Sequence, residues 1–164
     1  MGSLCAGLVT AGGARTGLGA EVALVLVTST KTPLENLSLG DLRQLFLGAT
    51  LRDDQGGTLV PLNQEPGTPE RKAFDRRVLG LSPDEMARYW IDQKVRGLKG
   101  APRNLGPPQM LARVVERFAG AVAYLRPDQT HPGLRALRID GRPSTHPHYA
   151  LAAPLKTAPT SPNP

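Results

Sequence analysis

The sequence predicts an α/β fold in which a mixed sheet is flanked by helices. Short apolar, β-branched runs alternate along the chain with longer amphipathic segments, and capping residues or glycines separate them. Strands are expected at 22–27, 58–62, 120–125 and 134–139. Apolar residues make up 40% of the chain, enough for a core, and the aromatic share of 4% makes that core mainly aliphatic.

The first strand and the first helix follow directly from this pattern. Residues 21–27 read EVALVLV, a run typical of a central strand that is buried on both faces. Ser38 precedes a helix predicted over 39–47, and Asp41 lies three residues later, as in a capping box. Gly48 then ends that helix.

A second strand, a tight loop and a second helix are expected next. The run 59–62 reads LVPL and predicts a short buried strand. The loop 65–68, of sequence EPGT, follows it. Thr68 and Pro69 have the residue types of a helix N-cap and first helical position, so a helix is predicted over 69–79.

A third helix has the strongest start signal in the chain. Ser82 and Glu85 form a capping-box pattern around a proline at the first helical position. Met86, Tyr89 and Trp90 then fall at helical spacing on one face. We interpret that face as core rather than as a ligand platform.

The remaining elements are read from glycines and from apolar periodicity. The glycine-rich, basic run 97–106 predicts a mobile loop. A helix is expected from 107 or 108 to 118, and a buried strand at 120–125. Residues 134–139 read LRALRI, an alternation typical of an edge strand with one solvent-exposed face.

The loop 65–68 is a candidate anion site. The first turn of a helix presents free N–H groups and the positive end of the helix dipole, which favour phosphate, sulfate or carboxylate. Gly67 and Thr68 would line such a site. The simpler alternative is that Thr68 only caps the helix. Pro69 removes one donor and Glu70 places a carboxylate beside the ligand position, so any site here is predicted to be weak.

Several blocks of the sequence, in the same order and spacing, resemble a known family. They are LSLGDLRQLFLG at 37–48, PGTPERKAFDRRVLG at 66–80, SPDEMARYW at 82–90 and FAGAVAYL at 118–125. The stretch 21–141 is similar to the short phosphate-transporter substrate-binding-like proteins of bacteria, in the type II periplasmic binding protein superfamily. The resemblance implies a single lobe of that fold and non-enzymatic binding of inorganic phosphate or another oxyanion, related to phosphate ABC transport.

The phosphate loop of that family is only partly matched. Gly67 and Thr68 stand at its glycine and threonine positions, while its serine position holds Pro66. Its phosphate-clamping arginine would fall on Leu62 or Asn63, neither of which can make the bidentate, charge-assisted bonds of a guanidinium.

Further ligand contacts are expected from other parts of the lobe. The resemblance suggests Ser29, Thr30 or Ser38 as additional hydrogen-bond donors. Arg71 lies one turn into the helix and could turn toward the loop. The alternative is that the Arg71 side chain stays in solvent on the helix surface, beside acidic neighbours.

The length of 164 residues leaves room for one lobe at 21–141. Residues 1–20 are predicted to be a poorly ordered leader or signal remnant, and residues 142–164 a disordered, proline-rich tail. A single lobe forms only half of a binding cleft. A homodimer, or an envelope transporter or sensor as partner, could supply the other wall.

The N-terminal residues suggest a location outside the cytoplasm. Residues 4–11 are apolar and are followed by small residues, which is compatible with a signal peptide whose basic start is missing; an unstructured leader is the alternative. A periplasmic or secreted protein is therefore predicted. Cys5 is the single cysteine, so an intrachain disulfide is excluded, and no run of the sequence approaches the roughly 20 apolar residues of a transmembrane helix.

Charge and histidine content argue against two other classes of function. The net charge is +6, but lysines and arginines are spread out without interleaved aromatic residues, so nucleic acid is not an expected partner. His131, His146 and His148 lie at no catalytic or metal-ligand spacing. No enzymatic activity, cofactor or metal site is predicted. The alternative to an oxyanion-binding lobe is an interaction or sensory module that kept the lobe and lost the ligand.

Overall fold

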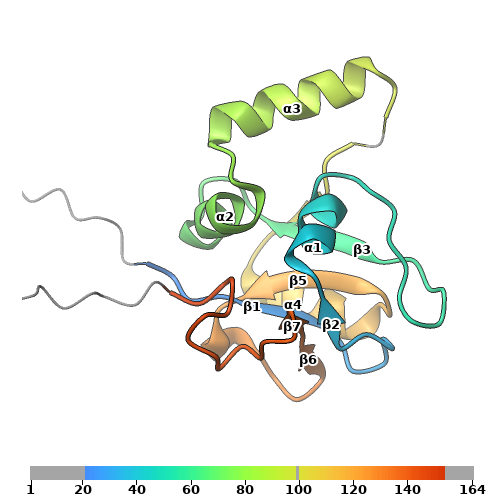
Figure 1. Cartoon of the computed structure of the whole chain (residues 1–164), viewed down its shortest axis with the longest axis vertical. Coiled ribbons are helices and arrows are strands. Elements are labelled where there is room, and N and C mark those ends of the chain that lie inside the picture. Colours follow the sequence, from blue (N-terminus) through green and yellow to red (C-terminus); the bar gives the residue numbers. More distant parts are fainter. Residues whose placement is uncertain (1–20, 99, 154–164) are drawn as a thin grey trace, which may run out of the picture.

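The computed structural model describes residues 21–98 and 100–153 (Figure 1). The predicted leader at 1–20 and the last part of the predicted tail, 154–164, lie outside the described residues. Within the described ranges the chain forms a mixed sheet with helices on both faces, as the sequence predicted. The predicted fold class is therefore confirmed.

The described ranges contain a five-stranded sheet in the order β4-β3-β5-β1-β6. β1 runs antiparallel to β5 and β6, whereas β3 runs parallel to β4 and β5. A small second sheet pairs β2 with β7 in parallel. The strand bounds are β1 Val25–Ser29, β2 Asn36–Leu37, β3 Val60–Gln64, β4 Arg103–Leu105, β5 Ala121–Leu125, β6 Leu134–Ala136 and β7 Arg138–Ile139.

The central strands are buried on both faces because helices cover both. Successive side chains of a strand point to opposite faces, so Val25 and Val27 pack with α4 while Leu26 packs with α1 and α2. Every residue of β1 and β5 is buried. The apolar run of the first strand is thus explained by helices on both sides of one sheet. The edge strand predicted over 134–139 is divided at Leu137: β6 forms the edge of the main sheet, and β7 belongs to the small second sheet.

The helices begin where their capping residues predicted. Ser38 accepts from the backbone N–H of Asp41, and Ser82 with Glu85 forms the complete capping box. The predicted helix 69–79 is instead divided into six α-helical residues and a π-helical turn that ends at left-handed Gly80. The helix bounds are α1 Leu39–Phe46, α2 Pro69–Phe74, the π-turn η1 Asp75–Leu79, α3 Pro83–Val95, α4 Pro108–Arg117 and the 3₁₀ turn η2 Pro127–Gln129.

The structure corrects the prediction of a loop across 97–106. Residues 103–105 form β4, which pairs in parallel with β3 at the edge of the sheet. Arg103 and Asn104 are exposed, so this strand is made by backbone pairing and has no apolar pattern to reveal it. The other described residues of the run lie outside the helices and strands.

The described part of the predicted tail also differs from the expectation. Tyr149 and Leu151 are buried in the core, and the Tyr149 hydroxyl accepts from the Leu26 N–H and donates to the Leu137 carbonyl. The carbonyl of Leu151 accepts from the N–H of Leu24 at 2.9 Å. These two buried residues therefore anchor the proline-rich stretch to the core.

Helix α3 lies apart from the sheet, above α1 and α2 in Figure 1. Met86 is its buried residue, and the Tyr89 hydroxyl donates to the Leu47 carbonyl. Trp90 is half-buried and packs on the edge of the core rather than inside it. Ile91 and Val95 are 64% and 80% exposed. The helix is therefore attached along one side and leaves the other open to solvent.

Candidate oxyanion site

The predicted anion loop lies at the C-terminal end of β3, directly before α2. Gly67 has φ +87°, a left-handed conformation that glycine adopts without strain, and it turns the chain from the strand into the helix. Thr68 is the N-cap of α2. The sequence prediction of strand, glycine and helix start in this order is matched by the geometry.

Most hydrogen-bonding groups of the loop are already used within the protein. The Thr68 hydroxyl accepts from the N–H of Arg71 at 3.3 Å and donates to the Glu65 carbonyl at 2.9 Å. The N–H of Thr68 donates to the same carbonyl at 3.4 Å, and Pro69 has no N–H to offer. The helix start therefore presents few free donors to an anion.

The side chain of Arg71 is buried and points toward the end of β3. Its Nη1 donates to the Gln64 carbonyl at 3.3 Å and to Asn104 Oδ1 at 3.2 Å. Its Nε lies 2.9 and 2.8 Å from the two carboxylate oxygens of Asp75. The guanidinium thus connects β3, β4 and α2. The alternative prediction, that Arg71 is a solvated arginine on the helix surface, is wrong.

Two carboxylates of α2 and its C-cap pair with the arginines near the loop. Glu70 is buried in the first turn and forms an ion pair with Arg126. Burial raises the pKa of Asp75 above its usual value, and the nearby Arg71 guanidinium acts in the opposite direction. Arg71 and Arg126 are therefore each paired with an acidic side chain.

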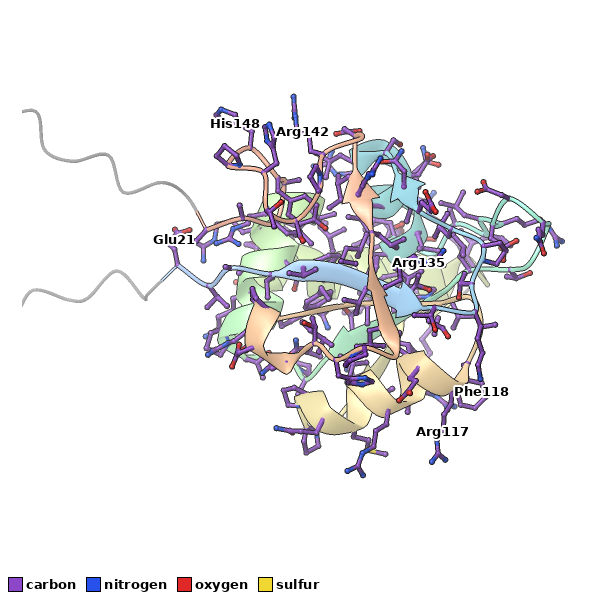
Figure 2. All side chains as sticks on the ribbon, turned by 90° about the horizontal axis from the view of Figure 1, so that it is seen from below. Glu21, Arg117, Phe118, Arg135, Arg142 and His148 are labelled. Carbon is purple, nitrogen blue, oxygen red and sulfur yellow. The ribbon has the colours of Figure 1, made fainter. Side chains whose placement is uncertain are left out.

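Ser29 and Thr30 lie at the opposite end of the sheet from this loop. β1 is antiparallel to β5, so its C-terminal end lies beside the N-terminal ends of β5 and β3. The hydroxyl of buried Ser29 donates to the Glu116 carbonyl at 3.0 Å. The Thr30 carbonyl accepts from Arg135, which Figure 2 shows at the β6 edge. The structure does not bring these two residues to Gly67 and Thr68.

Ser38 is engaged at the start of α1. Its hydroxyl accepts from the Asp41 N–H at 2.9 Å and donates to the Asp41 carboxylate at 2.8 Å. The next residue, Leu39, donates its N–H to Asp140, at the end of the small second sheet. Of the six predicted contact residues, the structure therefore gathers Gly67, Thr68 and Arg71 at one place.

A buried polar network beside the loop was not predicted from the sequence. The Tyr124 hydroxyl donates to Asn63 Oδ1 at 3.0 Å, and the Gln64 side chain donates to the Tyr124 carbonyl. Burial raises the pKa of Tyr124 well above its usual range. Asn63 and Gln64 end a strand whose other residues are apolar, and that interruption is the signal by which they could have been found.

Metal ligands and membrane-spanning helices are two further features that the described residues allow us to assess. Within residues 21–98 and 100–153 no group of three or more His, Cys, Asp or Glu side chains could hold a metal ion. His146 and His148 lie in the segment after β7, where the Nδ1 of His146 accepts from the His148 N–H. In the same described part of the chain, no helix has the length and apolar character that crossing a membrane requires.

Solved structures of phosphate-binding proteins share this fold. A protein assigned as a phosphate ABC transporter substrate-binding protein from Clostridium perfringens, solved with bound phosphate, matches 75% of this chain with TM-score 0.61 and 18% identity. An ABC-type phosphate transport receptor from Vibrio cholerae matches 75% with TM-score 0.60 and 17% identity. PstS from Borrelia burgdorferi matches 73% with TM-score 0.56 and 14% identity.

The likeness is one of fold, and it covers part of each neighbour. The chain spans 47% of the Clostridium protein and 48% of the other two, about half of their length. No protein-family model matches the sequence, and no curated protein matches it. The predicted single lobe of a periplasmic-binding-protein-like fold is therefore confirmed at the level of structure.

Proposed function

We propose that this chain is a non-enzymatic binding module that holds an oxyanion weakly at the start of α2. The observation that carries the proposal is the placement of Gly67 and Thr68 at the junction of β3 and α2, in a lobe whose structural neighbours include a protein solved with phosphate. A helix start after a strand end favours an anion through its N–H groups and its dipole.

The proposed affinity is low because the strongest contacts are missing. Leu62 and Asn63 stand where the resemblance would place a phosphate-clamping arginine, and Arg71 is bonded to Asp75 instead. Charge-assisted bonds to a phosphate are worth roughly 1.5 to 3 kcal/mol each. A dissociation constant of about 1 mM corresponds to only about −4.1 kcal/mol, which the remaining neutral donors could supply.

A second candidate function is favoured because the hydrogen-bonding and charged groups of the same loop already have partners. Thr68, Glu70 and Arg71 all have partners inside the protein. A lobe whose ligand groups serve its own structure fits an interaction or sensory module that binds no anion. The partner would then be a homodimer mate or an envelope transporter or sensor.

Phosphate titration distinguishes the two candidates. We expect weak binding of inorganic phosphate by calorimetry, with an accompanying rise in melting temperature. Thr68→Ala should lower the affinity by about fivefold, because a bound phosphate would draw the Thr68 hydroxyl away from the Glu65 carbonyl and gain one neutral hydrogen bond, worth about 1 kcal/mol. Ser82→Ala is the matched control, because it removes the same kind of N-cap from α3 and should lower stability without changing phosphate affinity.

Each other outcome of that titration has a definite meaning. Submicromolar binding by a monomer, or an affinity that Thr68→Ala leaves unchanged, would contradict a weak site at this loop. Absence of binding up to about 10 mM phosphate, about ten times the expected dissociation constant, would favour the interaction module.

The proposal includes a location outside the cytoplasm of a bacterium, beside a transporter or an envelope sensor. Its support is the apolar stretch at 4–11 together with the fold of the neighbours. When the gene is expressed from its furthest upstream in-frame start, we expect an antibody to the lobe to detect it in the periplasmic or secreted fraction, with the leader removed. Recovery only in the cytosol, with an uncleaved leader, would refute this part of the proposal.

A further inference from the structure

A groove of about 710 Å³ lies between α3 and the segment formed by α2 and η1. This volume falls within the range of small-molecule sites, which is roughly 300 to 1,000 Å³. The groove is adjacent to the anion loop, since Pro66 and Gly67 form part of its wall, but it extends away from Thr68 along α3. We call it the α3 groove.

Most of the wall of the α3 groove is apolar. Leu81 comes from the connection before α3, and Pro83, Met86, Ala87 and Trp90 come from the helix itself. Ala87 is exposed and Trp90 is half-buried, so this wall is open to an incoming molecule. The indole N–H of Trp90 is enclosed and has no hydrogen-bond partner within the described part of the chain.

The opposite wall of the α3 groove is basic. It holds Arg71, Lys72, Asp75 and Arg76, which sum to two positive charges. Arg71 and Asp75 neutralise each other, as described above. Lys72 is exposed, and Arg76 is 71% exposed and lies 3.9 Å from Glu21 in a long ion pair. Two cationic side chains therefore remain available beside the apolar wall.

We infer that the α3 groove binds an amphiphilic anion, with an acidic head near Lys72 and Arg76 and an aliphatic tail along Leu81, Met86 and Trp90. A tail excludes water from the apolar wall, which a bare inorganic anion cannot do. The cationic side chains then favour a carboxylate over a neutral head of the same size, although solvent screens these exposed charges. This site goes beyond the proposed oxyanion function and does not use Thr68.

Octanoate is a suitable probe, and Trp90 is the reporter. The chain contains a single tryptophan, so its fluorescence reports this groove alone. We expect octanoate to shift the emission of Trp90 with saturable binding, about five times tighter than 1-octanol. Hexanoate should bind about tenfold more weakly than octanoate, because each buried methylene contributes to transfer from water. Acetate should produce no shift.

Three variants of the full chain localise the binding. Ala87→Phe fills the groove from an exposed helix position and should weaken octanoate binding at least tenfold. Lys72→Gln combined with Arg76→Gln should remove the preference for octanoate over octanol. Arg117→Gln is the matched control and should change nothing. This exposed arginine, labelled in Figure 2, lies at the end of α4, which packs in the other core cluster from α3.

The outcomes separate this inference from the proposed function. Thr68→Ala should leave octanoate binding intact, and Ala87→Phe should leave phosphate binding intact. Equal binding of acetate and octanoate, no change of Trp90 emission at millimolar octanoate, or octanoate binding unaffected by Ala87→Phe would each overturn the inference. Dimers at micromolar protein concentration that Ala87→Phe dissociates would also overturn it, because a second copy would then be the occupant.

Discussion

A chain that ends after Gly141 is expected to be less stable, by about 5 kcal/mol or more, than a chain that ends after Ala153. The first deletion removes Tyr149 and Leu151, which are buried, and large-to-small changes of single buried residues of this size already cost about 2 to 5 kcal/mol. It also leaves the N–H groups of Leu24 and Leu26 without their acceptors.

Urea unfolding followed by circular dichroism measures the difference between the two chains. Because total stabilities of domains are about 5 to 15 kcal/mol, the shorter chain should be largely unfolded or close to it at 25 °C. Equal midpoints for both chains would show that the contacts of Tyr149 and Leu151 contribute nothing in solution.

The second large effect is expected at Tyr124, at the centre of the core. Its ring stacks on Phe74, with centroids 3.9 Å apart and planes 6° from parallel, and its hydroxyl satisfies Asn63. Tyr124→Ala should cost about 3 to 5 kcal/mol by leaving a cavity. Tyr124→Phe keeps the stack but leaves a buried Asn63 oxygen without its donor, which should cost about 1 to 3 kcal/mol.

The pH dependence of stability gives an independent check on the same residue. Burial raises the pKa of Tyr124 above 10 and that of Tyr149 to about 12, so the unfolded chain ionises first as the pH rises. The unfolded state then binds fewer protons than the folded state, and stability should fall above about pH 10. Tyr124→Phe should make this alkaline loss shallower. An alkaline slope identical in wild type and Tyr124→Phe would argue against burial of the hydroxyl.

Local signals in the sequence predict the helix starts well and the edges of the sheet poorly. Ser38, Thr68 and Ser82 each cap a helix as predicted, because capping depends on residues within one turn. β4 was missed because Arg103–Leu105 is fixed by backbone pairing with β3, a long-range contact that leaves no apolar periodicity. The π-turn at Asp75–Leu79 likewise has no separate residue pattern.

In the candidate site, too, local features could be predicted from the sequence and long-range contacts could not. Gly67 and Thr68 could be placed from local order, since a glycine and a cap follow a strand run. The pairing of Arg71 with Asp75 obeys helical spacing, yet its burial depends on Asn104, which lies in the strand that was missed. The distance between Ser29 and the loop depends on strand direction, and residue types alone do not reveal that direction.

Arg77 ties the two ends of the described chain to each other. Its Nη1 donates to the carbonyls of Val22 and Leu151, and its Nη2 pairs with Glu21, which Figure 2 shows where the described chain begins. The first and last described segments of the chain therefore lie next to each other, beside the core. Neighbouring ends suit insertion of the whole lobe into a surface loop of a host protein, because the two host residues that flank the insertion can stay close together. A circularly permuted chain that joins these ends by a short linker would keep every strand of the sheet in its place.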